Sequence, residues 1–212
     1  MQFTFKILSA FCLLLLCMAI LLFAIAIYLY PGGNPVVQDT LSFDFSKNYL
    51  CNLFNDHGIN TLPNQGKYFA LMATASLSLS FAITFYLFPA ILSLKRVTQY
   101  WVQGLGSSSM VIGFFIFSPF HDTVINVAGT LGLISLLIIL YHLLQQKKYL
   151  NLLLVMMAIL SSGITYFIYY SGVWFGSLAI MQKLSLFMFM IWLGHSHMVL
   201  PKKNRAPKLV NS

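Results

Sequence analysis

The sequence predicts an all-α integral membrane protein, a six-transmembrane-helix bundle with a short amphipathic helix in the first outer loop. Two observations predict this fold class. Of the 212 residues, 59% are hydrophobic and only 8% are charged, whereas soluble domains carry about a quarter charged residues. The apolar residues also fall into six windows, each near the roughly 20 residues that cross about 30 Å of hydrocarbon. The windows are 7–30, 68–94, 101–118, 123–144, 149–170 and 173–200.

Residues that end helices or attract water separate these windows. Proline, glycine, lysine, arginine, glutamine and serine fill the breaks at 31–33, 95–96, 118–119, 145–148 and 171–172. The third window is the weakest, because the segment QGLGSSSM dilutes its first half. The sequence therefore predicts a single membrane domain over 1–200, with a long outer loop at 31–66 and a basic tail at 201–212.

The basic residues predict the orientation of the bundle. Short loops rich in lysine and arginine stay in the cytoplasm. In a six-span arrangement nine basic residues share the side of both termini, and all four acids lie on the other side with Lys47 and Lys67. We therefore expect cytoplasmic termini, in a bacterial inner membrane or a plasma membrane. The net charge of +8 is read as a topology signal that attracts anionic lipid, and nucleic acid is not an expected partner.

The first window permits a second interpretation. A basic start at Lys6, a long apolar run and the small residues AIA at 24–26 resemble a signal peptide. The apolar run continues through Tyr30, which is long for a signal peptide, so we interpret it as a retained span. Cleavage would leave five spans. The three cysteines, two in this window and Cys51 in the loop, predict no disulfide.

The outer loop contains a segment that divides its side chains at helical spacing. We expect 44–57 to form an amphipathic helix on the bilayer or over the bundle, ending near Gly58. Its polar face carries Asp44, Asn48 and Asn52, with Asp56 near the end. That face is either simply solvated or forms the rim of a polar pocket, since amides bind carbonyl, hydroxyl and phosphate groups alike.

The turn SPFHDTVINVAGT opens the fourth window with a second polar group. Asp122 suits a helix N-terminus, where the partial positive charge of the helix favours a carboxylate. Asn126 and Gly129 share its face, which indicates packing against other helices. His121 is expected to be an interfacial histidine, with a ligand or proton-carrying role as the alternative.

Lys183 lies inside the sixth window, where a charge is costly. Its depth allows it to reach the headgroup region. Its face also holds Gly172, Gly176 and Ala179, and small residues at this spacing predict a close helix contact. We therefore expect Lys183 to point into the bundle toward an acid, Asp122 first and then Asp56 or Asp44. The pair is either a structural brace or part of a functional site.

The remaining polar residues suggest no metal or cofactor. His195 and His197 are two residues apart, so a helix turns them to opposite sides, whereas helical zinc ligands need a spacing of four. With His142 they are expected to be interfacial. No nucleotide loop, CxxC pair, nucleophile elbow or HExxH motif occurs.

The layout resembles the DRAM/Frag-type six-helix membrane proteins and related bacterial membrane families of unknown function. The resemblance rests on the loop FDFSKNYLCNLFNDHGINTLPNQGKYF, on SPFHDTVINVAG at the fourth window and on MQKLS in the sixth. Such families usually carry a short Ser-Asp motif before a glycine of the loop, and the run 51–58, CNLFNDHG, departs from it. The resemblance implies a six-span bundle with a polar cluster on the outer side.

These observations lead to a functional hypothesis. We expect an outer polar pocket that binds a lipid headgroup or a small polar ligand, with membrane lipids as partners. Its residues would be Asp44, Asn48, Asp56, His121, Asp122, Asn126 and Lys183. One alternative is a membrane enzyme acting on lipid by acid–base or metal-assisted chemistry, although the histidines divide between the two sides. Another is a scaffold without a ligand. A transporter is disfavoured, because no paired broken helices indicate inverted repeats.

Overall fold

The computed structural model describes residues 2–203, with side chains described over 5–199. The predicted basic tail therefore lies outside the described residues from position 204 onward. Six long helices and three short 3-10 helices account for most of the described chain. The long helices are α1 Gln2–Tyr28, α2 Lys67–Ile91, α3 Arg96–Gly113, α4 His121–Gln145, α5 Tyr149–Ser171 and α6 Leu178–Lys203. The short ones are η1 Leu50–Phe54, η2 Phe114–Phe117 and η3 Phe175–Ser177.

The prediction of an all-α fold with six long apolar helices is confirmed. Each of the six is long and apolar enough to cross a membrane. Three helices begin five residues away from the start of their predicted windows, and α1 is the first of them, since it begins at Gln2 and not at position 7. Helix α3 begins at Arg96, five residues before the start of its window, because the largely polar residues 96–100 continue the same helix. Helix α6 begins at Leu178, five residues after the start of its window at position 173.

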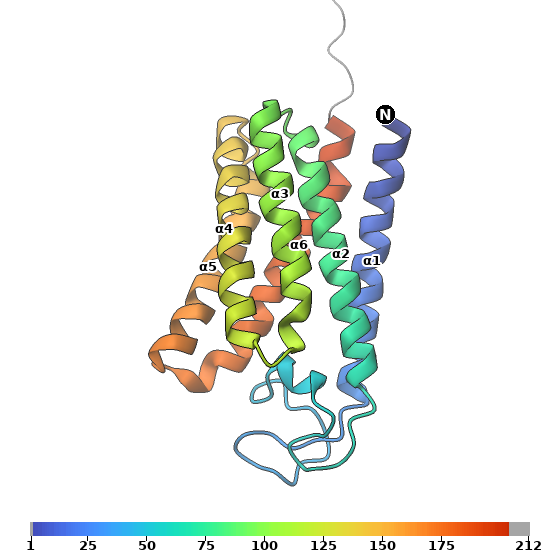
Figure 1. Cartoon of the computed structure of the whole chain (residues 1–212), viewed down its shortest axis with the longest axis vertical. Helices are drawn as coiled ribbons and strands as arrows, with labels where there is room; N and C mark the ends of the chain where they lie inside the picture. Colours follow the sequence, from blue (N-terminus) through green and yellow to red (C-terminus); the bar gives the residue numbers. More distant parts are fainter. Residues whose placement is uncertain (1, 204–212) are drawn as a thin grey trace, which may run out of the picture.

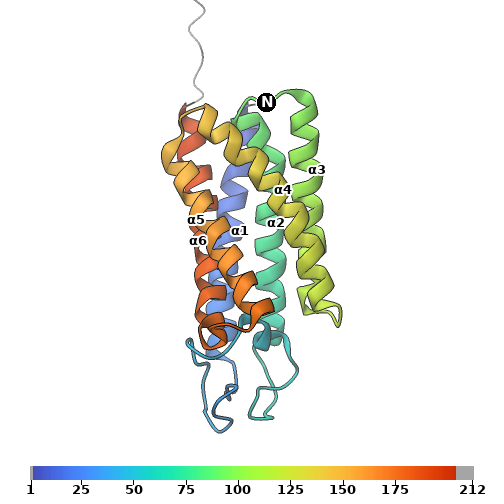
Figure 2. The same cartoon turned by 90° about the vertical axis from the view of Figure 1, so that its left-hand side faces the viewer.

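The helices form a closed bundle. Each packs against the next along the chain, and α1 also contacts α6. Helix α2 contacts α6 as well, so it lies nearer the interior than its neighbours. Both described chain ends lie at one end of the bundle, called here the terminal end, and the loop between α1 and α2 covers the other, called the loop end (Figures 1 and 2).

Large apolar side chains fill the interior between α2 and α6. Trp192 is fully buried and its ring lies 5.5 Å from that of Phe88. Helix α3 approaches α2 closely because Gly106 has no side chain, and a Cβ there would lie 2.3 Å from the ring of Phe85. Steric fit at such positions fixes how far each helix is rotated toward its neighbours.

The predicted amphipathic helix over 44–57 is wrong. Only η1, Leu50–Phe54, is helical there. Asn48, expected on the polar face of that helix as either a solvated or a pocket residue, is fully buried: its side-chain amide donates to the Gly33 carbonyl oxygen and accepts from the Asp44 N–H, both at 2.8 Å. Asparagine side chains that bond to backbone compete with helix formation. The two hydrogen bonds of Asn48 hold the loop in its conformation, and the spacing of the apolar residues does not predict them.

The predicted glycine stripe on the sixth helix is also wrong in part. Gly172 and Trp174 adopt left-handed backbone conformations, with φ of 71° and 56°, so the chain turns before α6 begins. Gly172 and Gly176 therefore lie outside α6, and a Cβ at either would meet nothing within 4 Å. Ala179 is buried as predicted, but Phe187, which helical spacing puts on the same face as Lys183, is 56% exposed.

Candidate functional site

Lys183 holds the loop onto the bundle. Its ammonium donates to the backbone carbonyl oxygen of Asn48 and, at 2.8 Å, to that of Ala179 in its own helix. The rings of Phe43 and Phe45 lie 5.4 and 5.9 Å from its nitrogen, a distance at which an aromatic face attracts a cation. These five residues are called the loop clamp.

The neighbouring residue of α6 strengthens the same contact. The side-chain oxygen of Gln182 accepts from the Leu50 N–H at 2.9 Å, which satisfies the first backbone donor of η1. The segment MQKLS thus supplies two consecutive polar side chains that bind backbone groups of the loop. Their bonds join positions more than 130 residues apart in the chain.

The predicted ion pair between Lys183 and Asp122 is not formed. Within the described residues the ion pairs are Lys67 with Asp56 and, if the imidazole is protonated, His121 with Asp122. Lys183 therefore satisfies its ammonium with carbonyl oxygens instead of a carboxylate. The reason is position: the clamp lies where α6 meets the loop, whereas Asp122 opens α4 and faces α5.

Two of the predicted acids make local contacts within the loop. Lys67 donates to the Asp56 carboxylate, and this hydrogen bond together with the positive charge holds the pKa of Asp56 below its ordinary value. The hydroxyl and N–H of Ser46 donate to Asp44 and lower its pKa in the same sense. Both carboxylates are exposed to solvent, so they shape the loop surface without entering the bundle.

The other predicted residues gather where α4 meets α5. Tyr169 donates its hydroxyl to the Asp122 carboxylate at 2.7 Å, and the imidazole of His121 lies 3.2 Å from the same oxygen. One turn further along α4, the side-chain oxygen of Asn126 accepts from Tyr166 and Tyr170, both at 3.1 Å. These six residues are called the α4–α5 seam.

The α4–α5 seam remains open to the surroundings. The Asp122 side chain is 62% exposed, and the three tyrosines are exposed as well. The rings of Tyr166 and Tyr170 lie 4.5 Å apart, and Tyr169 stands edge-on to Tyr170 at 5.0 Å. The seam thus presents an uncovered carboxylate beside aromatic faces, an arrangement that attracts a cationic group.

The seven predicted site residues therefore fall into three groups. The loop clamp contains Asn48 and Lys183, and Asp44 lies in the turn beside it. Asp56 pairs with Lys67. The three others, His121, Asp122 and Asn126, belong to the α4–α5 seam. Sequence reasoning missed the tyrosines of α5. Their spacing at 166, 169 and 170 puts the hydroxyls on one helix face, and that was the available signal.

The terminal end contains a buried histidine whose burial the sequence did not predict. His197, expected at the interface, is only 4% exposed. Its Nε2 lies 2.9 Å from the Thr84 hydroxyl and its Nδ1 lies 3.1 Å from that of Ser9. The Thr84 hydroxyl also lies within hydrogen-bond distance of the Ser80 carbonyl oxygen, and when it donates there it accepts from Nε2–H. This network joins α6 to α1 and α2.

No group of three or more His, Cys, Asp or Glu side chains among the described residues is placed to hold a metal ion. The second histidine, His195, lies 3.4 Å from the Asn151 amide instead.

Comparison with known proteins gave no relative. No family model, no curated protein and no solved structure matches this chain. Function must therefore be argued from the geometry.

Proposed function

We propose that this chain is an integral membrane protein of six spans, with the terminal end in the cytoplasm and the loop end outside. Large apolar side chains cover the outer faces of the long helices, and in no helix is more than 50% of the most apolar window buried. A soluble monomer rarely exposes so much apolar surface. The four acids lie at the loop end and most basic residues at the terminal end, as the positive-inside rule requires.

Labelling from each side tests this topology. Gln38 lies in the loop and Gln146 between α4 and α5. Single cysteines at these positions, in a variant whose native cysteines are replaced by serine, should react with a membrane-impermeant maleimide from opposite sides of sealed vesicles. Labelling of both from the same side would contradict the six-span arrangement.

We propose further that the α4–α5 seam binds the cationic ammonium group of a lipid headgroup. One observation carries this proposal: Asp122 is an exposed carboxylate with no lysine or arginine partner among the described residues, and Tyr169 of α5 donates to it while Tyr166 and Tyr170 bind Asn126 one turn away. Carboxylate charge and aromatic faces together favour an ammonium group, above all a quaternary one. The seam lies at the loop end of α5, where headgroups would meet the bundle.

A scaffold is the second candidate. Asn126 already accepts from two tyrosine hydroxyls and donates to that of Tyr170 at 2.8 Å, which serves the contact between α4 and α5. Under this alternative the tyrosines form an interfacial aromatic belt. The acid–base enzyme alternative needs Lys183 beside His121 and Asp122. The bonds of Lys183 to Asn48 and Ala179 argue against it. The resemblance to the DRAM/Frag-type proteins stays a prediction.

Lipid binding separates the ligand site from the scaffold. The purified protein would be titrated with phosphatidylcholine and with phosphatidylglycerol of the same acyl chains, and bound lipid measured by native mass spectrometry. We expect phosphatidylcholine binding to weaken about tenfold in Asp122→Asn and in Tyr169→Phe. Asp39→Asn is the matched control, because Asp39 is an exposed loop acid with the same charge change.

The outcomes differ clearly. Equal phosphatidylcholine binding by the wild type and Asp122→Asn would refute the headgroup site. A lowered melting temperature in Tyr169→Phe with unchanged binding would establish the scaffold role. Titration with tetramethylammonium alone shows whether the ammonium group suffices without the lipid chains.

A further inference from the structure

The segment 104–109 of α3 is rich in small residues, and only some of them serve helix packing. Gly106 lets Phe85 approach, while the hydroxyls of Ser107 and Ser109 donate to backbone carbonyls of α2 and α4. Gly104 and Ser108 make no such contact. Both are exposed, and a Cβ on Gly104 would meet nothing within 4 Å. Their small size therefore leaves an outward surface of α3 open.

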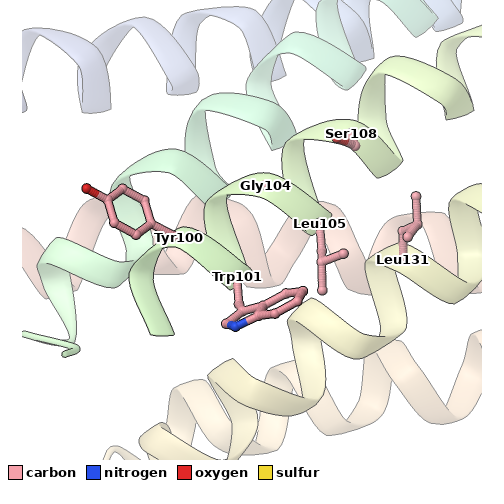
Figure 3. Close-up of a pocket in the computed structure, with 6 residues that line it drawn as sticks. All are labelled: Tyr100, Trp101, Gly104, Leu105, Ser108 and Leu131. Carbon is pink, nitrogen blue, oxygen red and sulfur yellow. The ribbon is translucent and has the colours of Figure 1, made fainter. Parts of the chain in front are cut away.

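This opening forms an apolar groove of about 410 Å³ between α3 and α4. Its lining consists of Tyr100, Trp101, Gly104, Leu105, Ser108 and Leu131. Figure 3 shows Trp101 and Leu105 on the side of α3 that faces α4, with no side chain at Gly104 between them. From Tyr100 to Ser108 the groove follows the helix for roughly 12 Å, which is most of one leaflet of about 15 Å.

A cation without an acidic partner contacts Tyr100, the lining residue nearest the start of α3. The Arg96 Nε donates to the Tyr100 hydroxyl at 3.1 Å, and its guanidinium carbon lies 5.9 Å from the same ring. Lys95 beside it is exposed. All four acids of the chain are Asp39, Asp44, Asp56 and Asp122. They lie at the loop end, so none neutralises these two charges.

The same place also offers backbone donors. Helix α3 begins at Arg96, and no side chain caps its N-terminus. Free N–H groups and the helix dipole at such an end favour an anion. Positive charge at the start of α3 and an apolar channel along the helix match the two parts of one molecule, a phosphate-bearing headgroup and an acyl chain.

We propose that the α3–α4 groove binds an anionic phospholipid, with its acyl chain along Gly104 and Ser108 and its phosphate at Lys95 and Arg96. The inference rests on the proposed membrane insertion but not on the α4–α5 seam. Its chemistry is opposite to that of the seam, because the charge at the groove selects an anion and the charge at the seam selects a cation. The two sites also lie at opposite ends of the bundle.

A substitution can fill the groove without disturbing the fold. Leucine is favoured over glycine in a helix, and the Cβ that Gly104→Leu adds would meet no atom within 4 Å. Gly163→Leu is the matched control, because Gly163 on α5 is likewise exposed and free of neighbours. For the charges, the double variant Lys95→Gln, Arg96→Gln is compared with Lys6→Gln, another exposed basic residue at the terminal end.

The experiment measures retained lipid by native mass spectrometry after incubation with phosphatidylglycerol and phosphatidylcholine of equal chain length. The wild type should retain phosphatidylglycerol in preference. Gly104→Leu should retain about tenfold less of it with an unchanged melting temperature, and the double glutamine variant should lose the preference. Both controls should behave as wild type.

Three results would overturn the proposal. The first is wild-type retention of phosphatidylglycerol by Gly104→Leu, and the second is an equal loss in Lys6→Gln. The third is a shift of Gly104→Leu from dimer to monomer on size exclusion with lipid retention unchanged, which would assign the groove to a second copy of the chain. Loss of phosphatidylcholine binding in Asp122→Asn alone bears on the α4–α5 seam and leaves this groove untouched.

Discussion

The ammonium of Lys183 donates to the backbone carbonyl oxygen of Asn48, a residue 135 positions earlier in the chain. A charged side chain in an apolar helix thus fastens the loop to the bundle, and no carboxylate takes part. The bond explains the segment MQKLS without invoking a reaction. It also ties the loop to α6, the last of the six long helices among the described residues.

Lys183→Met should destabilise the protein by about 2 kcal/mol, because the hydrogen bond from a charged group to the carbonyl of the buried residue Asn48 is lost. Asp122→Asn should not compensate, and the two changes should be additive, since residues without shared partners act independently. Unfolding in mixed micelles by increasing SDS measures both. Recovery of stability in the double variant would instead support the Lys183–Asp122 ion pair that the sequence predicts.

Asn48→Ala should loosen the whole loop. The change leaves the Gly33 carbonyl oxygen and the Asp44 N–H without their buried partner, at a cost of about 2 kcal/mol. Hydrogen exchange over 31–66 should speed up, while the helices remain protected. Asn55→Ala is the control, because Asn55 is exposed in the same loop. Equal exchange in both variants would contradict the role assigned to Asn48.

His197→Leu should weaken the contact of α6 with α1 and α2. Two hydrogen bonds between helices are lost, and such bonds contribute about 1 kcal/mol in membrane proteins. The exposed loop residue His57 supplies the control His57→Leu, with an expected change within about 0.5 kcal/mol. Nitrogen chemical shifts of labelled histidine should also show the proton of His197 on Nε2. A proton on Nδ1 would refute the assigned hydrogen-bond direction.

Asp56 should make the loop sensitive to acid. Lys67 lowers the pKa of Asp56 in the folded chain, so the pair contributes stability above the unfolded pKa of about 3.9. That contribution is lost as the pH falls through the lower, folded pKa. Thermal unfolding between pH 6 and pH 3 should therefore separate the wild type from Asp56→Asn only at the upper end of this range. A difference in melting temperature that stays constant over this pH range would exclude the Asp56–Lys67 pair as the cause of the acid sensitivity.

The candidate site was foreseen only in fragments. Asp122 and Asn126 share a face of α4, and helical spacing alone predicts that. Their partners Tyr166, Tyr169 and Tyr170 lie 40 or more positions away in the chain. Which helix comes beside α4, and how far it is rotated, depends on packing and not on local pattern.

The sequence by itself determined the six helices, their order and the separation of charges between the two ends. These depend on local composition, because each span must satisfy its backbone within itself and present apolar side chains over a fixed length. Only the tertiary structure decided the loop conformation, the carbonyl partners of Lys183 and the burial of His197. Each of those three features depends on groups that are distant in the chain. The hydropathy pattern does not predict such contacts, because a uniformly apolar helix can rotate and change its partners while its hydropathy pattern stays the same.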